Sequence, residues 1–469
     1  MKKEQIISLI AYLKSYIKVY DKANNRTYIS SKQAIENPTH FYELRSAISN
    51  QFLKKILYEA LKIVLQDNDV KELSNTLDFH CRDEGKGNTI HKRVANIDDN
   101  IYVNMGDCTV FKITDTFVKH VTKSKAKFML NHNIGPMVYP DLKKSDLSLL
   151  RKHIIVSDDV FKLIIVAILN SFCANTPHVI IIITGEAGSA KSTTEKILKT
   201  TTDPSSVSLQ DQFSNNKDLV IAALQSHVID INNVSKISDQ MQNQMCTILT
   251  GGTYTARGLY TNNDQVSIAL HNPIIINGIG NVVTRDDLLE RSILVELEKI
   301  SSSARKTEDQ VMSEFHNDLP SIMGGIFNTL SNILKVKKDF EMPKRLNRMA
   351  DFHLLGVMTE EVLEWEKGSF TKAYNANIAL AQGDVIDNSP IATALIALKD
   401  SKFLPFKGTY GELIGVLKLQ GGMNDMTPRK LTNELQRLKF SLRKLHGIKI
   451  RKMGRVGKGK LLLVEFVGG

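Results

Sequence analysis

The stretch that decides the fold is His178-Val179-Ile180-Ile181-Ile182-Ile183-Thr184, followed directly by Gly185-Glu186-Ala187-Gly188-Ser189-Ala190-Lys191-Ser192-Thr193. A run of β-branched apolar residues is typical of a strand that is buried in a parallel sheet. The second part is a loop of small residues ending in Lys-Ser-Thr, and Thr194–Lys199 after it has the pattern of a helix. The sequence therefore predicts a buried strand, a tight loop and a helix, in that order.

A strand, a glycine-containing loop and a helix in this order form the phosphate-binding unit of P-loop NTPases. Consecutive backbone N–H groups of Gly185–Thr193, aimed at the start of a helix, would surround the phosphates of ATP. We expect Lys191 to pair with the β- and γ-phosphates and Ser192 to hold Mg²⁺. Ala190 stands where the usual pattern has glycine, and its methyl group is tolerable if φ there is below zero. The alternative, a chance glycine-rich turn before a helix, does not account for the strand.

The composition is that of a globular, multidomain protein. A chain of 469 residues is long enough for about three or four domains, and 42% hydrophobic with 24% charged residues is ordinary. The four cysteines are scattered and form no CxxC pair, so neither a disulfide framework nor a zinc ribbon is indicated. A metal site from His80, Cys81, His91 and Cys108 is the alternative, but their spacing matches no common site.

The beginning of the chain and its apolar runs predict a cytoplasmic protein without a membrane partner. Met1–Gln5 leads into a charged amphipathic helix rather than a signal peptide. The longest apolar stretches, near 160–170 and 178–184, are too short to cross a bilayer.

The positive charge is concentrated at one end of the chain. Residues 427–460 contain twelve Lys or Arg and one Glu, so this segment alone accounts for the formal net charge of +11. A local basic excess of this kind predicts a surface that contacts nucleic acid. The alternative is a solvated basic tail, which the helix and strand periodicity of the segment disfavours.

The pattern of elements predicts an α/β fold with four parts. They are a mixed α+β domain at 1–145, a P-loop core at 146–300, a helical lid at 301–386 and a small basic domain at 387–469. In the first part, Lys32–Gln66 has a helical pattern, and short strand-like pieces follow from Asp78. These pieces are Leu77–Cys81, Thr89–Val94, Ile101–Met105, Val110–Ile113 and Phe117–Val121.

The last part has the order of a winged helix. Pro390–Lys399 and Thr409–Lys418 are predicted helices, and Thr427-Pro428 begins a third that runs to about Leu445. A β-hairpin follows around residues 454–459. In such a domain the third helix enters a major groove and the hairpin contacts backbone phosphates. The candidate DNA contacts are Lys430, Arg437, Lys444, Arg455, Lys458 and Lys460.

Further motifs follow the phosphate loop in an order that resembles a known family. They are Asn232-Asn233-Val234-Ser235, Thr250-Gly251-Gly252, Arg257 with Leu259-Tyr260-Thr261, Asn277-Gly278-Ile279, Thr284–Arg291 and Arg348–Phe352. The chain is similar to the self-loading, minichromosome-maintenance-like AAA+ helicases of staphylococcal pathogenicity islands and cassette chromosomes. Related ATPases occur on prophages and other mobile elements. The resemblance covers residues 150–400 well and is weaker in the first 145.

The resemblance implies roles for four residues of the core and lid. Asn277 would be sensor 1, which orients the attacking water near the γ-phosphate. Arg291 looks like an arginine finger that a neighbouring subunit donates, with Arg285 as a second candidate, because a guanidinium stabilises transition-state charge. Arg348 looks like sensor 2. The alternative for each is a surface arginine or a capping asparagine.

The resemblance also implies a hairpin that projects into the channel of a ring. Thr253–Tyr260 and Gln265–His271 read as its strands, with a tight turn between them. Arg257 and Tyr260 are the candidate contacts to a single strand of DNA. The alternative is a hairpin that only packs between subunits.

One departure from the family concerns the metal. By register with the family, the position that normally holds a metal-side Asp is Asn232, and the next position, often a catalytic Glu, is Asn233. An Asn carries no charge to balance a cation. Our hypothesis is that Asp230, two residues earlier on the same strand face, takes over this role. The rival hypothesis is slow hydrolysis in a protein that mainly binds nucleotide.

These features and the resemblance together predict an ATP- and Mg²⁺-dependent DNA helicase of a mobile genetic element. It would assemble as a ring, with a hexamer expected, and act on single-stranded and forked DNA beside other replication proteins. Two other classes remain open: a replication initiator or helicase loader that uses ATP as an assembly switch, and a non-enzymatic DNA-binding regulator.

Overall fold

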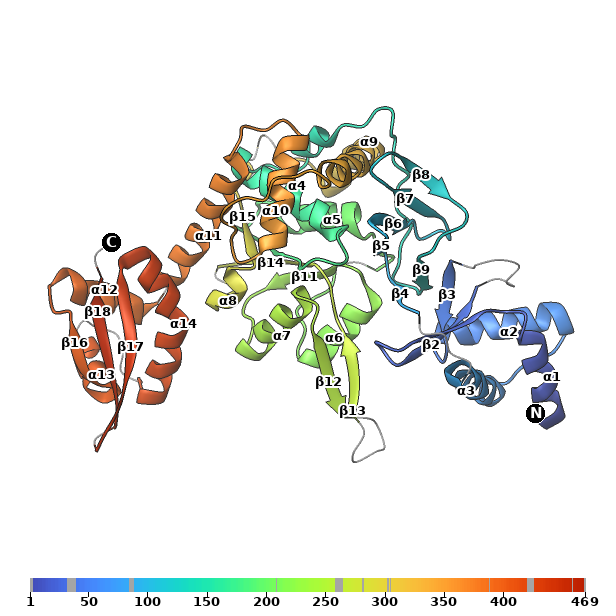
Figure 1. The fold of residues 1–469 in the computed structure, drawn as a ribbon, viewed down its shortest axis with the longest axis horizontal. Coiled ribbons are helices and arrows are strands. Elements are labelled where there is room, and N and C mark those ends of the chain that lie inside the picture. Colours follow the sequence, from blue (N-terminus) through green and yellow to red (C-terminus); the bar gives the residue numbers. More distant parts are fainter. Residues whose placement is uncertain are drawn as a thin grey trace.

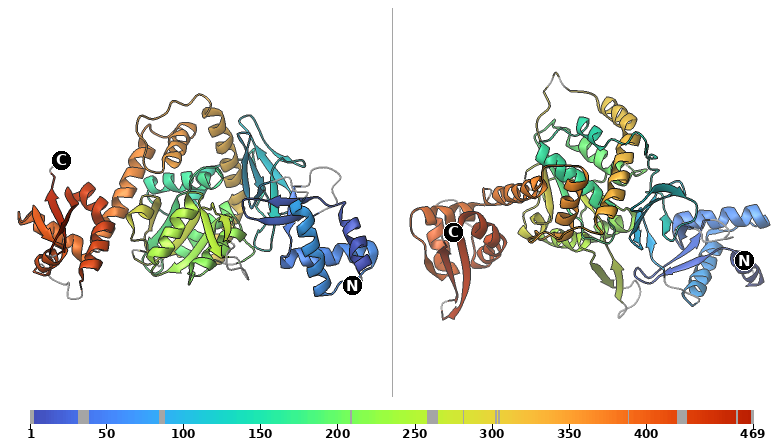
Figure 2. Two further views of the ribbon diagram at one scale, coloured as in Figure 1. Left: turned by 60° about the horizontal axis from the view of Figure 1, so that its bottom comes forward. Right: turned by 45° about the horizontal axis from the view of Figure 1, so that its top comes forward.

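The computed structural model describes residues 3–31, 39–83, 88–207, 209–257, 265–280, 282–301, 303, 305–387, 389–419, 426–457 and 459–467. Three parts lie in a row along the longest axis: the N-terminal elements, a central α/β body and the C-terminal elements (Figure 1). Two further views show the same arrangement (Figure 2). Among the described residues, no helix combines the length and the apolar character needed to cross a lipid bilayer.

The central body is built on a four-stranded parallel sheet with the order β11-β14-β10-β15. Its strands are β10 (Ile180–Gly185), β11 (Ile229–Val234), β14 (Ile274–Gly278) and β15 (Ser292–Leu297). The isoleucine run forms β10, with a neighbour on each side, and its side chains alternate between two cores. Ile181 and Ile183 belong to one hydrophobic cluster, and Ile180 and Ile182 belong to the other. The predicted parallel α/β arrangement is confirmed.

Helices cover both faces of this sheet. The cluster of Ile181 and Ile183 includes α4 (Asp158–Ser171) and α5 (Lys191–Thr202). The cluster of Ile180 and Ile182 includes α6 (Asn216–Gln225) and α7 (Asp239–Leu249). Side chains of Ser157, Asn215 and Ser238 accept backbone N–H groups at the starts of α4, α6 and α7, as N-caps do.

The segment after β15 is helical, as predicted. It contains α9 (Glu308–Val336), α10 (Ala350–Val362) and α11 (Ser369–Asp387). A short helix α8 (Asp286–Leu289) precedes β15, and a 3₁₀ helix η1 (Leu147–Lys152) precedes α4. Thr307 and Gln310 form a capping box at the start of α9. Apolar side chains of α9, α10 and α11 pack with α4 in one continuous core.

The N-terminal part contains two sheets and three helices. The helices are α1 (Lys3–Leu13), α2 (Ala47–Leu61) and α3 (Asp67–Asp83). One sheet has the order β1-β2-β3-β9-β4, and the other is the antiparallel meander β5-β6-β7-β8. Their strands are β1 (Lys18–Asp21), β2 (Arg26–Ser30), β3 (His40–Glu43), β4 (Ile90–His91), β5 (Val94–Ile97), β6 (Asn100–Asn104), β7 (Val110–Ile113), β8 (Val118–Val121) and β9 (Lys127–Leu130).

Two predictions for this part are wrong. Lys32–Gln66 is not helical throughout, because His40–Glu43 forms β3 and the helix begins only at Ala47. Leu77–Cys81 is not a strand but the last third of α3, whose buried apolar side chains recur at helical spacing. The strands predicted near 101–105, 110–113 and 117–121 are present as β6, β7 and β8.

The meander of β5–β8 is attached to the central body by a shared core and by a buried arginine. Apolar residues of β5, β6 and β7 belong to the same cluster as α4 and α9. Arg93 has no exposed surface, and its guanidinium donates to Asp203 Oδ1 at 2.8 Å, to Gly135 O at 2.9 Å and to Pro204 O at 2.9 Å. Asp203 ends helix α5, so Arg93 connects the N-terminal strands to the helix that follows the loop.

The C-terminal part has the predicted helices and hairpin, with one strand more. It consists of α12 (Pro390–Asp400), β16 (Phe406–Thr409), α13 (Tyr410–Lys418), α14 (Pro428–His446), β17 (Ile448–Val456) and β18 (Gly459–Phe466). The short β16 pairs with β18, which completes a three-stranded sheet β16-β18-β17. Thr427 caps α14 by accepting from Lys430 N, as its position before Pro428 predicts.

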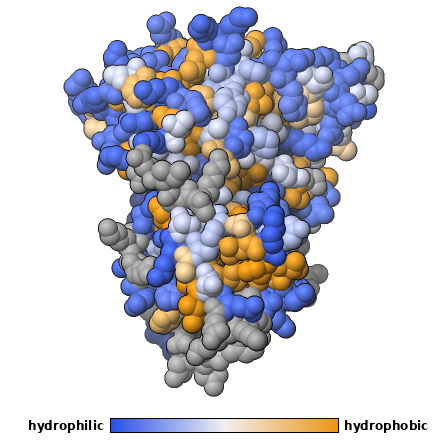
Figure 3. Space-filling view, turned by 90° about the vertical axis from the view of Figure 1, so that its right-hand side faces the viewer, coloured by the Kyte–Doolittle hydropathy of each residue, from blue (hydrophilic) through white to orange (hydrophobic). Residues whose placement is uncertain are grey.

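The N-terminal end of the molecule carries apolar surface. Figure 3, which faces this end, shows a group of hydrophobic side chains surrounded by hydrophilic ones. The N-terminal helices and the turn after α2 expose Ile7, Leu61 and Val64.

Candidate functional site

The loop between β10 and α5 is shaped by two glycines. Gly185 has φ +148°, and a Cβ there would lie 2.6 Å from Leu297 O and 2.6 Å from Ser189 Oγ. Gly188 has φ +83°, in the left-handed region that favours glycine. The chain therefore turns sharply from the carboxyl end of β10 into α5, and the first N–H groups of that helix face the loop, as in an anion-binding helix start.

Ala190 differs from the sequence prediction. Its φ is +61°, a left-handed conformation, whereas its tolerance had been tied to a φ below zero. A Cβ in this conformation lies close to the carbonyl oxygen, so the alanine is strained. Lys191 follows it, and its Nζ donates to Gly185 O at 2.8 Å and to Glu186 O at 2.9 Å. The lysine thus lies over the loop, where the sequence places it.

Polar side chains from three elements meet directly behind the loop. Ser192 Oγ lies 3.0 Å from Asn232 Oδ1, and Asn277 Nδ2 lies 2.7 Å from the same oxygen. The backbone N–H of Asn233 donates to Asn277 Oδ1 at 2.9 Å. They come together because β11 and β14 are parallel neighbours whose carboxyl ends meet at the edge beside α5. The structure therefore places Ser192, Asn232, Asn233 and Asn277 in one cluster.

Glu195 belongs to this cluster and was not predicted. It lies on α5, has no exposed surface, and its Oε2 accepts a hydrogen bond from Asn277 Nδ2. Burial raises the pKa of Glu195 to about 8, and the neighbouring Asp230 carboxylate adds to the increase. The signal that would have identified it is its position four residues after Lys191, which places both on the same side of the helix.

The partners of Asp230 do not fit the hypothesis that this residue takes over the metal-side role of the usual Asp. It is buried on β11, its Oδ1 lies 3.2 Å from Lys199 Nζ, and its Oδ2 accepts from Gln210 N at 2.9 Å. The oxygen that faces Ser192 belongs to Asn232. β11 also has an irregular register between Ile231 and Val234, which breaks the simple alternation used to align Asp230 with Asn232.

Arg285, Arg291 and Arg348 lie together around α8. Arg285 Nε donates to Asp287 Oδ1 at 3.1 Å, Arg291 Nη1 donates to Asp287 O, and Arg348 pairs with Glu290. β15 starts at Ser292, which is level with Ile180 at the beginning of β10. At about 3.3 Å per residue, the five steps from Ile180 to Gly185 span about 17 Å. The backbone of Arg291, the residue before Ser292, therefore lies at the opposite end of the sheet from the loop of its own chain.

Two cations near the loop were missed by the sequence prediction. A Cβ on Gly188 would lie 3.1 Å from Arg305 Nη2, so this guanidinium is next to the loop. Lys299 Nζ lies 3.3 Å from Glu186 Oε2. Both residues lie on the segment between β15 and α9, which passes over the loop. The sequence alone does not predict these contacts, because the segment is far from the loop along the chain and no motif links the two.

Two cavities are relevant to the question of where a ligand could bind. One of 360 Å³ opens beside Gly185 and Glu186 and is otherwise mainly apolar, with a volume in the range of ligand pockets. Its other lining residues are Ile182, Thr184, Ile279, Gly280, Val282, Val283, Leu289, Leu294, Glu296 and Ala381. A larger cavity of 1330 Å³ lies among α9, α10 and the start of α11, away from the loop.

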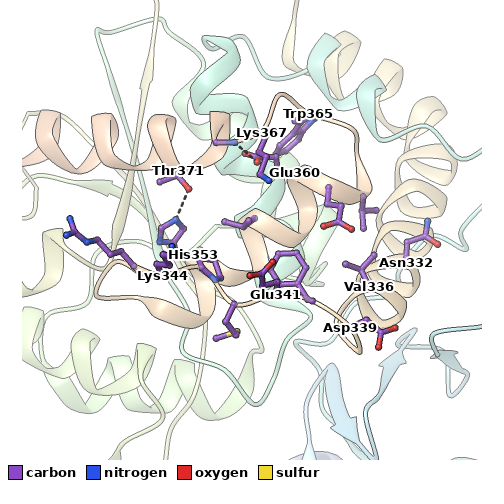
Figure 4. Close-up of a pocket in the computed structure, with 18 of the residues that line it drawn as sticks. Asn332, Val336, Asp339, Glu341, Lys344, His353, Glu360, Trp365, Lys367 and Thr371 are labelled. Atoms are coloured by element: carbon purple, nitrogen blue, oxygen red, sulfur yellow. Dashed lines mark hydrogen bonds between the residues drawn. The ribbon is translucent and has the colours of Figure 1, made fainter.

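The larger cavity is lined by residues of mixed charge, among them Lys344, Arg345, Glu341 and Glu361. Figure 4 shows acidic and basic side chains together on its wall. There His353 points toward Thr371: its Nδ1 accepts from Asn347 N at 3.0 Å, so its Nε2 carries the proton and donates to Thr371 at 2.9 Å. Burial lowers the pKa of His353. The loop, rather than this cavity, is therefore the candidate functional site.

A hairpin is present where the sequence predicts one, and its place in a channel stays a prediction. β12 (Thr253–Arg257) and β13 (Gln265–Ala269) pair antiparallel and project from the central body (Figure 1). Arg257 ends β12. Tyr260 and the rest of the turn lie outside the described residues, so the two predicted DNA contacts here remain predictions.

The predicted C-terminal DNA contacts lie on α14 and the β17–β18 hairpin. Lys430, Lys444, Arg455 and Lys460 are exposed, and Arg437 is half-buried with its guanidinium 2.8 Å from Glu434. Lys458 lies outside the described residues. Among the described residues, no cluster of His, Cys, Asp or Glu has the arrangement of a metal site, so the alternative built on His80, Cys81, His91 and Cys108 gains no support.

Comparison with known proteins gives one family match. Residues 147–376, just under half of the chain, match the family model of the actinomycete integrative conjugative element replication protein. No curated protein matches the chain. The match spans the loop, the Asn232–Asn277 cluster and the arginines around α8.

Several solved structures align over long stretches at low similarity. An active SCCmec type IV Cch helicase aligns with 11% identity and a TM-score of 0.47 over 96% of this chain and 93% of its own. The NrS-1 C-terminal region aligns with 12% identity and a TM-score of 0.36 over 98% of each chain. JCV helicase aligns with 11% identity and a TM-score of 0.23 over 48% of this chain and 67% of its own. TM-scores below 0.5 do not establish a common fold.

Proposed function

We propose that this chain is a P-loop ATPase of the AAA+ class that drives a DNA helicase. The observation that carries the proposal is the meeting of Ser192, Asn232 and Asn277 behind a glycine-shaped loop at the carboxyl edge of a parallel sheet. Ligands of open α/β sheets bind at this edge, and the helix start after the loop favours phosphate.

The residues present fit a nucleoside triphosphate with Mg²⁺. Lys191 already lies over the loop carbonyls and would exchange them for phosphate oxygens, while Arg305 adds a second cation on the same side. Ser192 would hold the metal ion, which neutralises phosphate charge during hydrolysis. The apolar cavity beside Gly185 has room for a base. Asn232 supplies the oxygen that faces Ser192, so we now favour Asn232 over Asp230 for the metal side.

The arginines around α8 fit a site shared between subunits. Arg291 directly precedes Ser292, which is level with Ile180, about 17 Å along β10 from Gly185 of the same chain, and Arg348 is paired with Glu290 next to it. In a closed ring, a head-to-tail interface places one end of a subunit against the other end of its neighbour. The arginines would then complete the neighbour's site, which supports assembly as a ring; the hexamer is the form that the family resemblance implies.

The remaining parts fit DNA. The β12–β13 hairpin projects from the body and would contact a single strand in the channel. The C-terminal part, with α14 followed by a basic hairpin, would act as a winged helix that contacts duplex DNA. The family match supports a role in replication of a mobile genetic element.

One observation favours a second candidate function. The Ser192 hydroxyl is paired with a neutral amide, Asn232, where a charged Asp is usual in the family that the chain resembles. A weakly charged metal site would slow hydrolysis, as in an initiator or helicase loader that uses ATP as an assembly switch.

A forked-DNA unwinding assay tests the proposal. Wild type, Lys191→Ala and the control Lys196→Ala, an exposed lysine of the same helix, are assayed for ATP hydrolysis with and without DNA and for strand separation. We expect wild type and the control to unwind and Lys191→Ala to be inactive in both assays. Hydrolysis stimulated by DNA without strand separation identifies the loader, and the absence of both activities from wild type refutes the ATPase proposal.

A further inference from the structure

The buried carboxyl of Glu195 occupies a central place behind the proposed nucleotide site. Its Oε2 accepts from Asn277 Nδ2, and its Oε1 is buried without a hydrogen-bond partner among the described residues. A carboxyl is rarely buried unless it has a specific task or partner. The question is what this side chain does for Asn277.

The orientation of the asparagine amides follows from one fixed donor. The backbone N–H of Asn233 can only donate, so the Asn277 atom that it meets at 2.9 Å is the oxygen Oδ1. The other Asn277 atom is therefore the amide nitrogen, which has two protons. One proton points at Glu195 Oε2 and the other at Asn232, so the Asn232 atom at 2.7 Å is its oxygen.

The same reasoning extends to Ser192. Its hydroxyl meets Asn232 Oδ1 at 3.0 Å, and because that oxygen only accepts, the Ser192 proton is donated to it. The lone pairs of Ser192 Oγ then remain available for a cation, and the Asn232 amide nitrogen is turned away from Ser192. A chain of hydrogen bonds thus runs from Glu195 through Asn277 and Asn232 to Ser192.

We propose that Glu195 is a positioning residue: by accepting one amide proton of Asn277, it holds Asn277 and Asn232 in the orientation that directs the Ser192 hydroxyl. This inference rests on the proposed ATPase function. The proposed role requires an accepting oxygen at the present position of Glu195 Oε2, and it does not require a negative charge. Outer partners of this kind commonly change the activity of a site 10- to 100-fold when they are removed.

Two conservative variants of Glu195 distinguish the position of the accepting oxygen from the ability of the side chain to ionise. Glu195→Gln keeps an accepting oxygen at the same distance but cannot ionise, whereas Glu195→Asp keeps the ionisable carboxyl and retracts it by one methylene group. Lys196→Met, which removes an exposed neighbour on the same helix, is the control. For each protein, kcat and KM for ATP are measured with Mg²⁺, together with affinity for a non-hydrolysable ATP analogue and the thermal unfolding midpoint.

We expect Glu195→Gln to keep kcat within about threefold of wild type and Glu195→Asp to lower it about tenfold or more, with a smaller change in KM. Low kcat in Glu195→Gln with near-normal kcat in Glu195→Asp overturns the proposal in favour of a charge role. Equal effects in both variants, whether none or complete, also overturn it, because they show no dependence on the accepting oxygen. A wild type that binds no analogue refutes the proposed function itself and is thereby distinguished from these outcomes.

Discussion

Replacing Ala190 by glycine should stabilise the protein, although glycine usually has the opposite effect. Ala190 has φ +61° at the start of α5. A non-glycine residue in this region costs about 1–2 kcal/mol. Glycine also makes the unfolded chain more flexible, which costs about 0.4–1 kcal/mol. The difference leaves a net gain of about 0.8 kcal/mol for Ala190→Gly at the midpoints of these ranges, and of at most about 1.6 kcal/mol.

The neighbouring Ala187 provides a matched control. It lies on the same loop, is exposed, and does not belong to the described residues with a positive φ. Ala187→Gly should therefore show only the unfolded-state effect and destabilise the protein by about 0.4–1 kcal/mol.

The two variants are compared with wild type by thermal unfolding, followed by circular dichroism, with and without an ATP analogue. The expected order of midpoints is Ala190→Gly above wild type and wild type above Ala187→Gly. If both glycines lower the midpoint equally, the strain at position 190 does not exist and the reasoning from its backbone conformation is refuted.

Three further predictions concern the site itself. Lys191→Ala and Arg291→Ala should each lose at least about 10³-fold in hydrolysis, and mixing the two should restore part of it; a mixture as inactive as its components contradicts a shared site. Asp230→Ala should lower the unfolding free energy by about 1–3 kcal/mol, because it removes one of the two carboxylates that pair with the buried Lys199 and leaves the Gln210 N–H without its acceptor; chemical denaturation measures this, and an unchanged free energy of unfolding contradicts it. The folded protein binds a proton at Glu195 up to about pH 8, well above the ordinary value of 4.5, so stability should decrease as the pH rises between these values. Glu195→Gln should remove this part of the pH dependence, and identical slopes for the two proteins argue against it.

The central sheet and the loop were predictable because their signals are local. Four consecutive isoleucines specify a buried strand wherever they occur, and the glycine-containing loop requires a sharp turn whatever surrounds it. The C-terminal helices were equally visible, since Thr427-Pro428 marks a helix start by itself.

The errors arose where a distant partner decides the structure. His40–Glu43 is a strand because it lies between two partners, the nearby Arg26–Ser30 and Lys127–Leu130, which is more than eighty residues later. Leu77–Cys81 resembles a strand when it is taken alone. The helical spacing of its apolar residues becomes visible only when the segment from Val70 is included. The short β16 is likewise a strand only because β18 lies beside it.

The candidate site was predictable only in part, because some of its residues lie in local motifs and others depend on packing between distant elements. Lys191, Ser192 and Asn277 follow from motifs, whereas the link from Glu195 to Asn277 depends on how α5 packs against β14. Likewise, the loop partner Arg305 comes from a segment without a recognisable pattern.

The shared core between the N-terminal meander and the central α/β body has a practical consequence. Val94, Val103 and Phe111 are buried in the same cluster as α4 and α9, and Arg93 is buried against the end of α5. Deleting residues 1–145 would therefore uncover apolar surface under the central body and remove the Arg93 partner of Asp203, which would keep Lys199. Loss of activity in such a truncation would report damage to the central body, so the role of the N-terminal region is better tested by substitutions on the outer faces of α2 and α3.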